Sequence, residues 1–156
     1  MPENTFTCRF PHSEHNAVIL DVEIRFVLPF EDDEKKLAVK LKALIDTGAT
    51  GSCISHRLAT ACRLEQISAV QIFSAQGASV SPLYEVDIVL PNGSVFEKIT
   101  VMEVAGSNNF DVIIGMDILT RCDFAISNVN GEMVFTMRIP SSNKAIDFTK
   151  EQDLHL

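Results

Sequence analysis

Two stretches of alternating apolar and polar residues constrain the fold of this chain more than any other feature. Residues 17 to 28 and residues 37 to 45 place apolar side chains at every second position, and a charged turn at residues 29 to 36 separates them. A period of two is the pattern of a strand with one buried face. These stretches therefore predict a pair of half-buried strands, and the second of them leads directly into an acidic residue, Asp46.

The rest of the chain adds strand patterns and turn signals at short intervals. Residues 67 to 90 predict a long hairpin whose small, glycine-containing tip spans residues 75 to 79, and Asn92-Gly93 is a strong signal for a second turn. Further strands are predicted over residues 95 to 104, 112 to 114, 124 to 126 and 133 to 139. Short helices are predicted from His56 to Cys62, after Ser55, and again after Gly115. This pattern predicts an all-β fold, either a barrel or a sandwich.

Asp46 is the first candidate for chemistry because it lies between a predicted strand and a glycine turn. Thr47 can hydrogen-bond neighbouring backbone, and Gly48 lets the chain turn sharply because it has no Cβ. Alone, these three residues are more typical of a strand followed by an Asx turn than of a catalytic site. A weaker echo of strand, glycine turn and helix recurs at residues 112 to 119.

Length and charge limit the partners that the chain can have. Its 156 residues are enough for one domain, and its formal net charge of −8 argues against nucleic acid or an anionic membrane as a partner. No apolar run approaches the roughly 20 residues of a membrane span, and residues 1 to 6 lack the features of a signal peptide. We therefore expect a cytoplasmic protein that contacts neither nucleic acid nor membrane.

Residues 1 to 16 have a mixed composition, and we expect them to form a loosely attached lead-in. Cys8, His12 and His15 within this segment could be drawn as metal ligands, but a closed structural zinc site needs four. We expect neither a metal nor a cofactor. The four cysteines of the chain show no C-x-x-C spacing, so four free thiols are expected.

Three motifs in register resemble a known family. Residues 43 to 50, Ala-Leu-Ile-Asp-Thr-Gly-Ala-Thr, resemble the active-site loop of retropepsin-like aspartic proteases. Residues 112 to 119 resemble the second hallmark of these proteases, two aliphatic residues and a glycine before a short helix. Residues 75 to 79 lie between them, where the family has its mobile flap. The match covers residues 17 to 139, which would form the protease domain, followed by a polar tail at residues 140 to 156.

The resemblance implies a closed, barrel-like protomer that forms a homodimer, with one Asp46 and one Thr47 from each chain in a shared site. Peptide hydrolysis by carboxylates alone needs one to act as base toward water and one to act as acid toward the carbonyl. Two carboxylates ~3 Å apart, at an effective dielectric constant of ~20, repel by roughly 5 kcal/mol. One proton therefore stays on the pair, and aspartic proteases are the general example of this arrangement.

The sequence contains a single Asp-Thr-Gly, so one protomer cannot supply both roles and a symmetric dimer is needed. A dyad of Asp46 with Asp117 of the same chain is the alternative, but it would discard the symmetric geometry. Two protomers of charge −8 repel at neutral pH, so we expect dimerisation to be favoured toward the sequence pI of about 4.9. Among the terminal strands, residues 133 to 139 are the predicted dimer interface.

The resemblance also assigns roles to residues around the site. Thr47 and Gly48 would support the active-site loop. The substrate-binding residues would be Ala49, Thr50, Gln76, Gly77, Ala78 and Ile114. Viral members often carry aspartate at the position of Thr50, where this chain has threonine. The predicted function is an aspartic endopeptidase that cleaves extended segments of peptide or protein substrates. The alternative is a catalytically inactive retropepsin-fold module that binds or scaffolds peptides.

Overall fold

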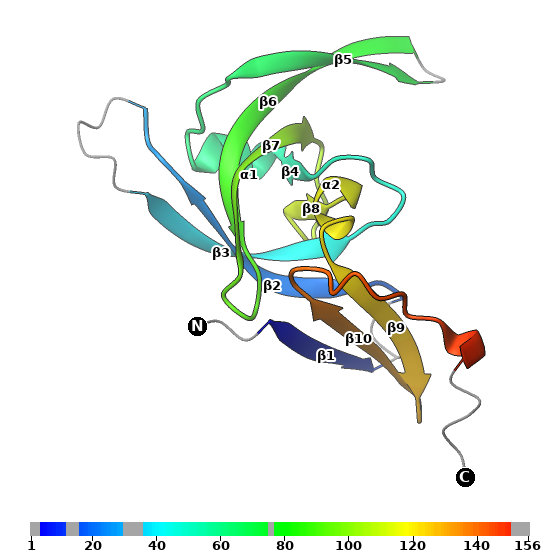
Figure 1. The fold of residues 1–156 in the computed structure, drawn as a ribbon. Coiled ribbons are helices and arrows are strands. Elements are labelled where there is room, and N and C mark those ends of the chain that lie inside the picture. Colours follow the sequence, from blue (N-terminus) through cyan, green and yellow to red (C-terminus); the bar gives the residue numbers. More distant parts are fainter. Residues whose placement is uncertain (1–3, 12–15, 30–35, 75–76, 151–156) are drawn as a thin grey trace.

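A closed β-barrel forms the centre of the molecule (Figure 1). The computed structural model describes residues 4 to 11, 16 to 29, 36 to 74 and 77 to 150. Within these residues the barrel has six strands, in the order β2 (Ile19–Phe26), β3 (Leu37–Ile45), β8 (Val112–Ile114), β4 (Cys53–Ser55), β7 (Val95–Val104) and β6 (Gly77–Val89). Antiparallel pairing of β2 with β6 closes the barrel. The predicted all-β barrel is confirmed, and a sandwich is excluded.

The first two barrel strands form where the alternating pattern predicts them. Every second side chain of β2 is buried in the barrel interior, namely Leu20, Val22, Ile24 and Phe26. β2 pairs antiparallel with β3 from one end to the other. β3 then pairs in parallel with β8, so that Ile45 lies opposite Ile114. This pairing places the second sequence motif directly beside the point where the chain leaves β3 and reaches Asp46.

Two short helices lie where the sequence predicts them. α1 (His56–Ala61) begins after Ser55, whose Oγ accepts a hydrogen bond of 3.1 Å from the backbone N–H of Leu58. This bond satisfies one of the unpaired N–H groups of the first turn. α2 (Met116–Leu119) begins after Gly115. No helix in the described ranges is long and apolar enough to cross a membrane.

The predicted hairpin is confirmed and forms an arm that extends beyond the barrel (Figure 1). β5 (Ser68–Ser74) pairs antiparallel with β6 over its whole length. The arm exposes large apolar side chains, since Phe73 is 77% exposed and Val80 is 71% exposed. Residues 75 and 76, at the tip, lie outside the described residues.

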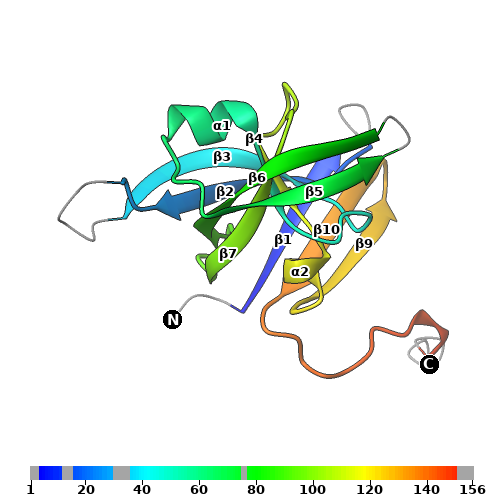
Figure 2. The same cartoon turned by 90° about the horizontal axis from the view of Figure 1, so that it is seen from above.

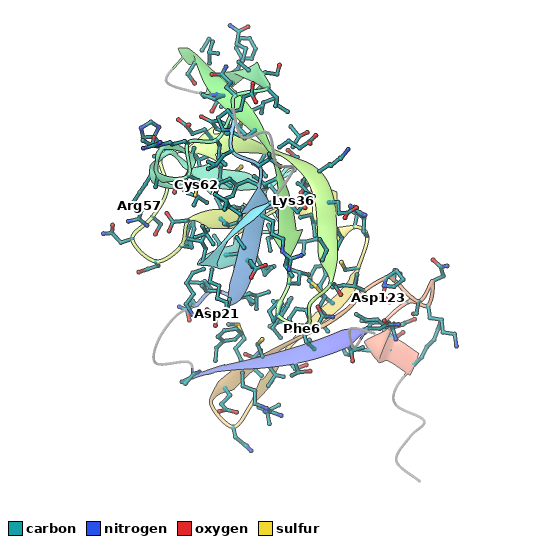
Figure 3. All side chains as sticks on the ribbon, turned by 90° about the vertical axis from the view of Figure 1, so that its left-hand side faces the viewer. Phe6, Asp21, Lys36, Arg57, Cys62 and Asp123 are labelled. Carbon is teal, nitrogen blue, oxygen red and sulfur yellow. The ribbon has the colours of Figure 1, made fainter. Side chains whose placement is uncertain are left out.

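A second sheet packs beside the barrel and corrects the expectation of a loose lead-in (Figure 2). Among the described residues it has three strands, in the order β1 (Thr5–Pro11), β10 (Glu132–Arg138) and β9 (Asp123–Val129). All seven residues of β1 pair with β10. Phe6, Cys8 and Phe10 pack against the core, and Phe6 lies on the barrel side of β1 (Figure 3). The signal for this strand was their alternation with polar residues.

The position of β10 limits how the predicted dimer interface at residues 133 to 139, which stays a prediction, could form. β10 lies in the middle of its sheet and is hydrogen-bonded to β1 on one side and to β9 on the other. Residues 133 to 139 therefore have no free edge with which to pair a strand of a second chain. Within the described part of this sheet, the outer edges belong to β1 and β9.

The first residues of the predicted polar tail are hydrogen-bonded to the second sheet. The Asp123 carboxylate accepts hydrogen bonds from the Ser141 hydroxyl at 2.6 Å, the Ser142 backbone N–H at 2.8 Å and the Arg138 guanidinium at 2.7 Å. These hydrogen bonds hold the pKa of Asp123 well below its usual range. The domain boundaries at residues 17 and 139 stay a prediction.

Candidate active site

Asp46 lies in a turn that holds its carboxylate in one orientation. Its backbone N–H donates to the carbonyl of Ile114 at 3.0 Å, which continues the pairing of β3 with β8. Its Oδ1 accepts a hydrogen bond from the backbone N–H of Gly48 at 2.8 Å. A Cβ on Gly48 would lie only 3.2 Å from Oδ1, so glycine lets the backbone come this close to the carboxylate. Asp46 is half-buried, while Thr47 and Gly48 are exposed.

The second sequence motif, residues 112 to 119, supports the Asp46 loop through backbone hydrogen bonds. The backbone N–H of Met116 donates to the carbonyl of Ala49 at 2.8 Å, and that of Asp117 donates to the carbonyl of Thr50 at 3.2 Å. The two stretches approach very closely at Gly115, where a Cβ would lie 2.6 Å from the carbonyl oxygen of Gly51. The internal echo seen in the sequence therefore corresponds to two turns that pack against each other.

Ser52 joins the two turns, and sequence reasoning missed it. Its side chain is almost fully buried. Its hydroxyl donates to Asp117 Oδ1 at 2.8 Å and accepts from the backbone N–H of Gly115 at 3.1 Å. The only available signal was a small hydroxyl residue between two glycine-containing motifs, which does not reveal a partner 65 residues away. Since the Asp117 carboxylate bonds Ser52, its role here is structural.

The predicted substrate-binding residues fall in two places. Ala49 and Thr50 follow directly on the Asp46 turn, with Ala49 half-buried and Thr50 exposed. Gly77 and Ala78 are exposed on the arm formed by β5 and β6, and Gln76 lies outside the described residues. Ile114 differs from the others because its side chain is fully buried in the core. Its carbonyl holds the N–H of Asp46, so the structure places Ile114 in the support of the loop.

Of the three residues considered as metal ligands from the sequence, two lie outside the described residues. Cys8 lies on β1, while His12 and His15 lie outside the described residues. Within the described ranges, no group of three or more histidine, cysteine, aspartate or glutamate side chains could hold a metal ion. The four cysteines are free thiols, as expected. Burial raises the pKa of the Cys53 thiol, which lies close to the active-site loop.

The barrel, the Asp46 turn supported by the β8–α2 motif, and the projecting hairpin define the class of retropepsin-like aspartic proteases. A family model described as "gag-polyprotein putative aspartyl protease" matches residues 38 to 121, more than half of the chain. The chain belongs to this family of aspartyl proteases. No curated protein compared with this chain matches it in sequence.

One solved structure shows the same fold at low sequence identity, and two others are similar to the chain to a lower degree. A retropepsin-like aspartic protease from Rickettsia conorii is 16% identical, with a TM-score of 0.51 over 83% of this chain and 98% of that one. The protease of simian foamy virus (mac) is 17% identical, with a TM-score of 0.47 over 66% of this chain and 92% of that one. The retroviral protease-like domain of Ddi1 from Leishmania major is 18% identical, with a TM-score of 0.39 over 81% of this chain and 98% of that one.

Proposed function

We propose that the protein is an aspartic endopeptidase whose active site forms when two copies of the chain bring their Asp46 carboxylates together. The observation that carries this proposal is the Asp46 turn itself. Its carboxylate is oriented by Gly48, its backbone is bonded to Ile114, and its loop rests on α2. A surface aspartate in an ordinary turn does not need this many fixed contacts.

A single protomer carries half of the chemistry. In the dimer, one Asp46 would accept a proton from a water molecule as the water oxygen attacks the carbonyl carbon of the peptide bond. The other Asp46 would donate a proton to the carbonyl oxygen, which gives a tetrahedral diol. The proton taken from water would then pass to the amide nitrogen as the C–N bond breaks and the diol returns its other proton to the pair, so that an acid and an amine leave. Because two adjacent carboxylates cannot both ionise freely, the pair would hold the single proton that this reaction needs. No metal or cofactor takes part in this scheme.

The substrate would be an extended segment of a peptide or protein, bound between the Asp46 loop and the arm. Ala49 and Thr50 would contact it from the loop, and residues 76 to 78 would contact it from the arm. We assign Ile114 to the support of Asp46, because its buried side chain offers no surface to a ligand.

A catalytically inactive peptide-binding module is the competing proposal, because the same fold can serve without catalysis. The two proposals differ in what Asp46 does. An inactive module would tolerate replacement of the carboxylate by its amide with little change in peptide binding. An endopeptidase would lose cleavage, since the amide can neither accept the proton of water nor donate one in the same way.

A peptide-library digest with the wild type and Asp46→Asn tests the proposal. We expect the wild type to cleave and Asp46→Asn to lose at least about 1,000-fold in rate, the size of effect typical of acid–base groups. Asp21→Asn is the matched control, because Asp21 is an exposed aspartate on β2 whose carboxylate pairs with Lys42. Its activity should equal that of the wild type.

Oligomeric state should be measured by sedimentation on the same samples, so that activity can be compared with the fraction of dimer. Cleavage by both the wild type and Asp46→Asn would contradict the proposal. So would the absence of cleavage by either protein between about pH 3 and pH 8 in samples that contain dimer.

A further inference from the structure

The arm is attached to the barrel at one short stretch of β6. From Leu83 onward, β6 pairs with β7 as part of the barrel. From Gly77 to Pro82, the strand that β6 pairs with in the described part of the chain is β5. Pro82 lies at the change of partner and has no N–H with which to continue the pairing. The direction of the arm is therefore decided by what holds the residues on either side of Pro82.

Glu103, on β7, bonds the chain on both sides of this point. Its backbone carbonyl accepts a hydrogen bond of 2.5 Å from the hydroxyl of Ser81, on the arm side. Its carboxylate Oε2 accepts a hydrogen bond of 2.7 Å from the hydroxyl of Tyr84, on the barrel side. Ser81 and Tyr84 are each buried to more than nine-tenths. These bonds fix the chain at the residue before Pro82 and at the second residue after it.

The second carboxylate oxygen of Glu103 bonds a third element. Oε1 lies 2.8 Å from Nδ1 of His56, at the start of α1. Burial raises the pKa of Glu103, but the hydrogen bonds from Tyr84 and His56 outweigh it and hold that pKa below its usual value. Burial and the bond to Glu103 raise the pKa of Tyr84 to about 12. At neutral pH the centre of this network is therefore an ionised carboxylate with a neutral phenol as donor.

We propose that Glu103 is a positioning residue, whose carboxylate sets the direction of the arm by bonding Tyr84 and His56 while its backbone carbonyl accepts the bond from Ser81. The proposal rests on the proposed function, because the arm is the element that would cover a peptide bound at Asp46. Glu103 itself lies on β7 and need not touch the substrate. Loss of its carboxylate would keep the bond from Ser81 to the backbone carbonyl, but it would release Tyr84 and so widen the range of directions that the arm samples.

Hydrogen exchange tests the mechanical part of the proposal without any use of activity. In Glu103→Gln, we expect the amides of Ser68 to Ser81 to exchange about tenfold faster, because the neutral amide holds Tyr84 and His56 less strongly than the carboxylate does. The amides of β2 and β3 should keep their rates. Glu85→Gln is the matched control. Glu85 is an exposed glutamate on β6 next to Tyr84, and its substitution removes the same charge. It should leave the arm unchanged.

Kinetics test the link to catalysis. If only a fraction of molecules hold the arm in the binding direction, the apparent affinity for substrate falls by that fraction. We expect Glu103→Gln to raise KM about fivefold for an extended peptide, with kcat changed by less than about twofold. Tyr84→Phe should raise KM in the same direction, and it should add little in the Glu103→Gln background because the two residues act through one bond.

The outcomes separate this proposal from the proposed function. Faster exchange throughout the barrel, or no change in the arm, would overturn the positioning role of Glu103 whether or not the protein is a protease. Faster exchange confined to the arm, with KM unchanged in an active enzyme, would overturn the link to substrate binding. If the wild type cleaves no peptide, the proposed function fails, and exchange in the arm still decides whether Glu103 positions it.

Discussion

The Asp46 loop is a turn that follows a strand, and the β5–β6 arm is a hairpin of two strands. The two are held in very different ways. The loop is bonded at Asp46, Ala49 and Thr50 to the β8–α2 motif, and Ser52 joins the two from inside. Among the described residues, the arm is bonded to the barrel near its base, and its outer part exposes both Phe73 and Val80. A rigid support for the carboxylate is thus combined with an arm whose described hydrogen bonds to the barrel lie at its base.

This comparison has a consequence for where substitutions act. Close packing at the loop means that a small added volume has no room, and a lost hydrogen bond leaves a buried group without a partner. On the arm, side chains already contact water, so their loss changes the free energy of unfolding very little. Stability should therefore respond to the loop, and substrate affinity to the arm.

Among substitutions in the loop and the arm, Gly115→Ala should have the largest effect on stability. Its Cβ would lie 2.6 Å from the carbonyl oxygen of Gly51 and 2.9 Å from that of Ala49, and both of these atoms belong to the backbone. The two turns would have to separate, at a cost of about 3 kcal/mol in the free energy of unfolding. Urea denaturation measures this cost, and peptidase activity should fall with it.

Gly51→Ala is the matched control for that substitution. A Cβ at Gly51 would meet no atom within 4 Å, so its unfolding free energy should stay within about 0.5 kcal/mol of the wild type. Equal stability of the Gly51 and Gly115 variants would show that the two turns do not need this close approach.

Ser52→Ala should have the second largest effect. It removes the acceptor for the N–H of Gly115 and the donor to Asp117, in a site with almost no exposure to water. Leaving these groups unpaired should lower the free energy of unfolding by about 2 kcal/mol. Ser127→Ala, at an exposed position of β9, gives the reference value for loss of a serine hydroxyl. A loss at Ser52 no greater than that reference would mean that the bridge contributes nothing.

Phe73→Ala should have the smallest effect, although it removes a large aromatic side chain. Phe73 lies on the arm and is 77% exposed, so the melting temperature should change little, corresponding to less than about 0.5 kcal/mol. Phe96→Ala, on β7, removes the same group from the core, where Phe96 is 3% exposed, and should cost about 3–4 kcal/mol. A large loss of stability in Phe73→Ala would show that the Phe73 side chain packs against the rest of the protein, contrary to its exposure on the arm.

Local patterns predicted most elements of the barrel. β2, β3, the hairpin and both short helices carry their own periodic or capping signals, and they appear close to the predicted bounds. β1 was missed because the alternation of Phe6, Cys8 and Phe10 lies in a segment that also contains a proline and histidines. The dimer interface at residues 133 to 139 stays a prediction, and the central place of this strand in its sheet was not foreseen, because no single strand carries the strand order of a sheet.

The sequence by itself determined that each chain has one Asp-Thr-Gly carboxylate, placed between a half-buried strand and a glycine turn. These features are local, since periodicity and the missing Cβ of glycine act within a few residues. Only the tertiary structure decided that β1 pairs with β10, that Ser52 joins two turns, and that Glu103 bonds both sides of Pro82. Such hydrogen bonds depend on segments that are distant in sequence, and only packing of the whole chain brings them together.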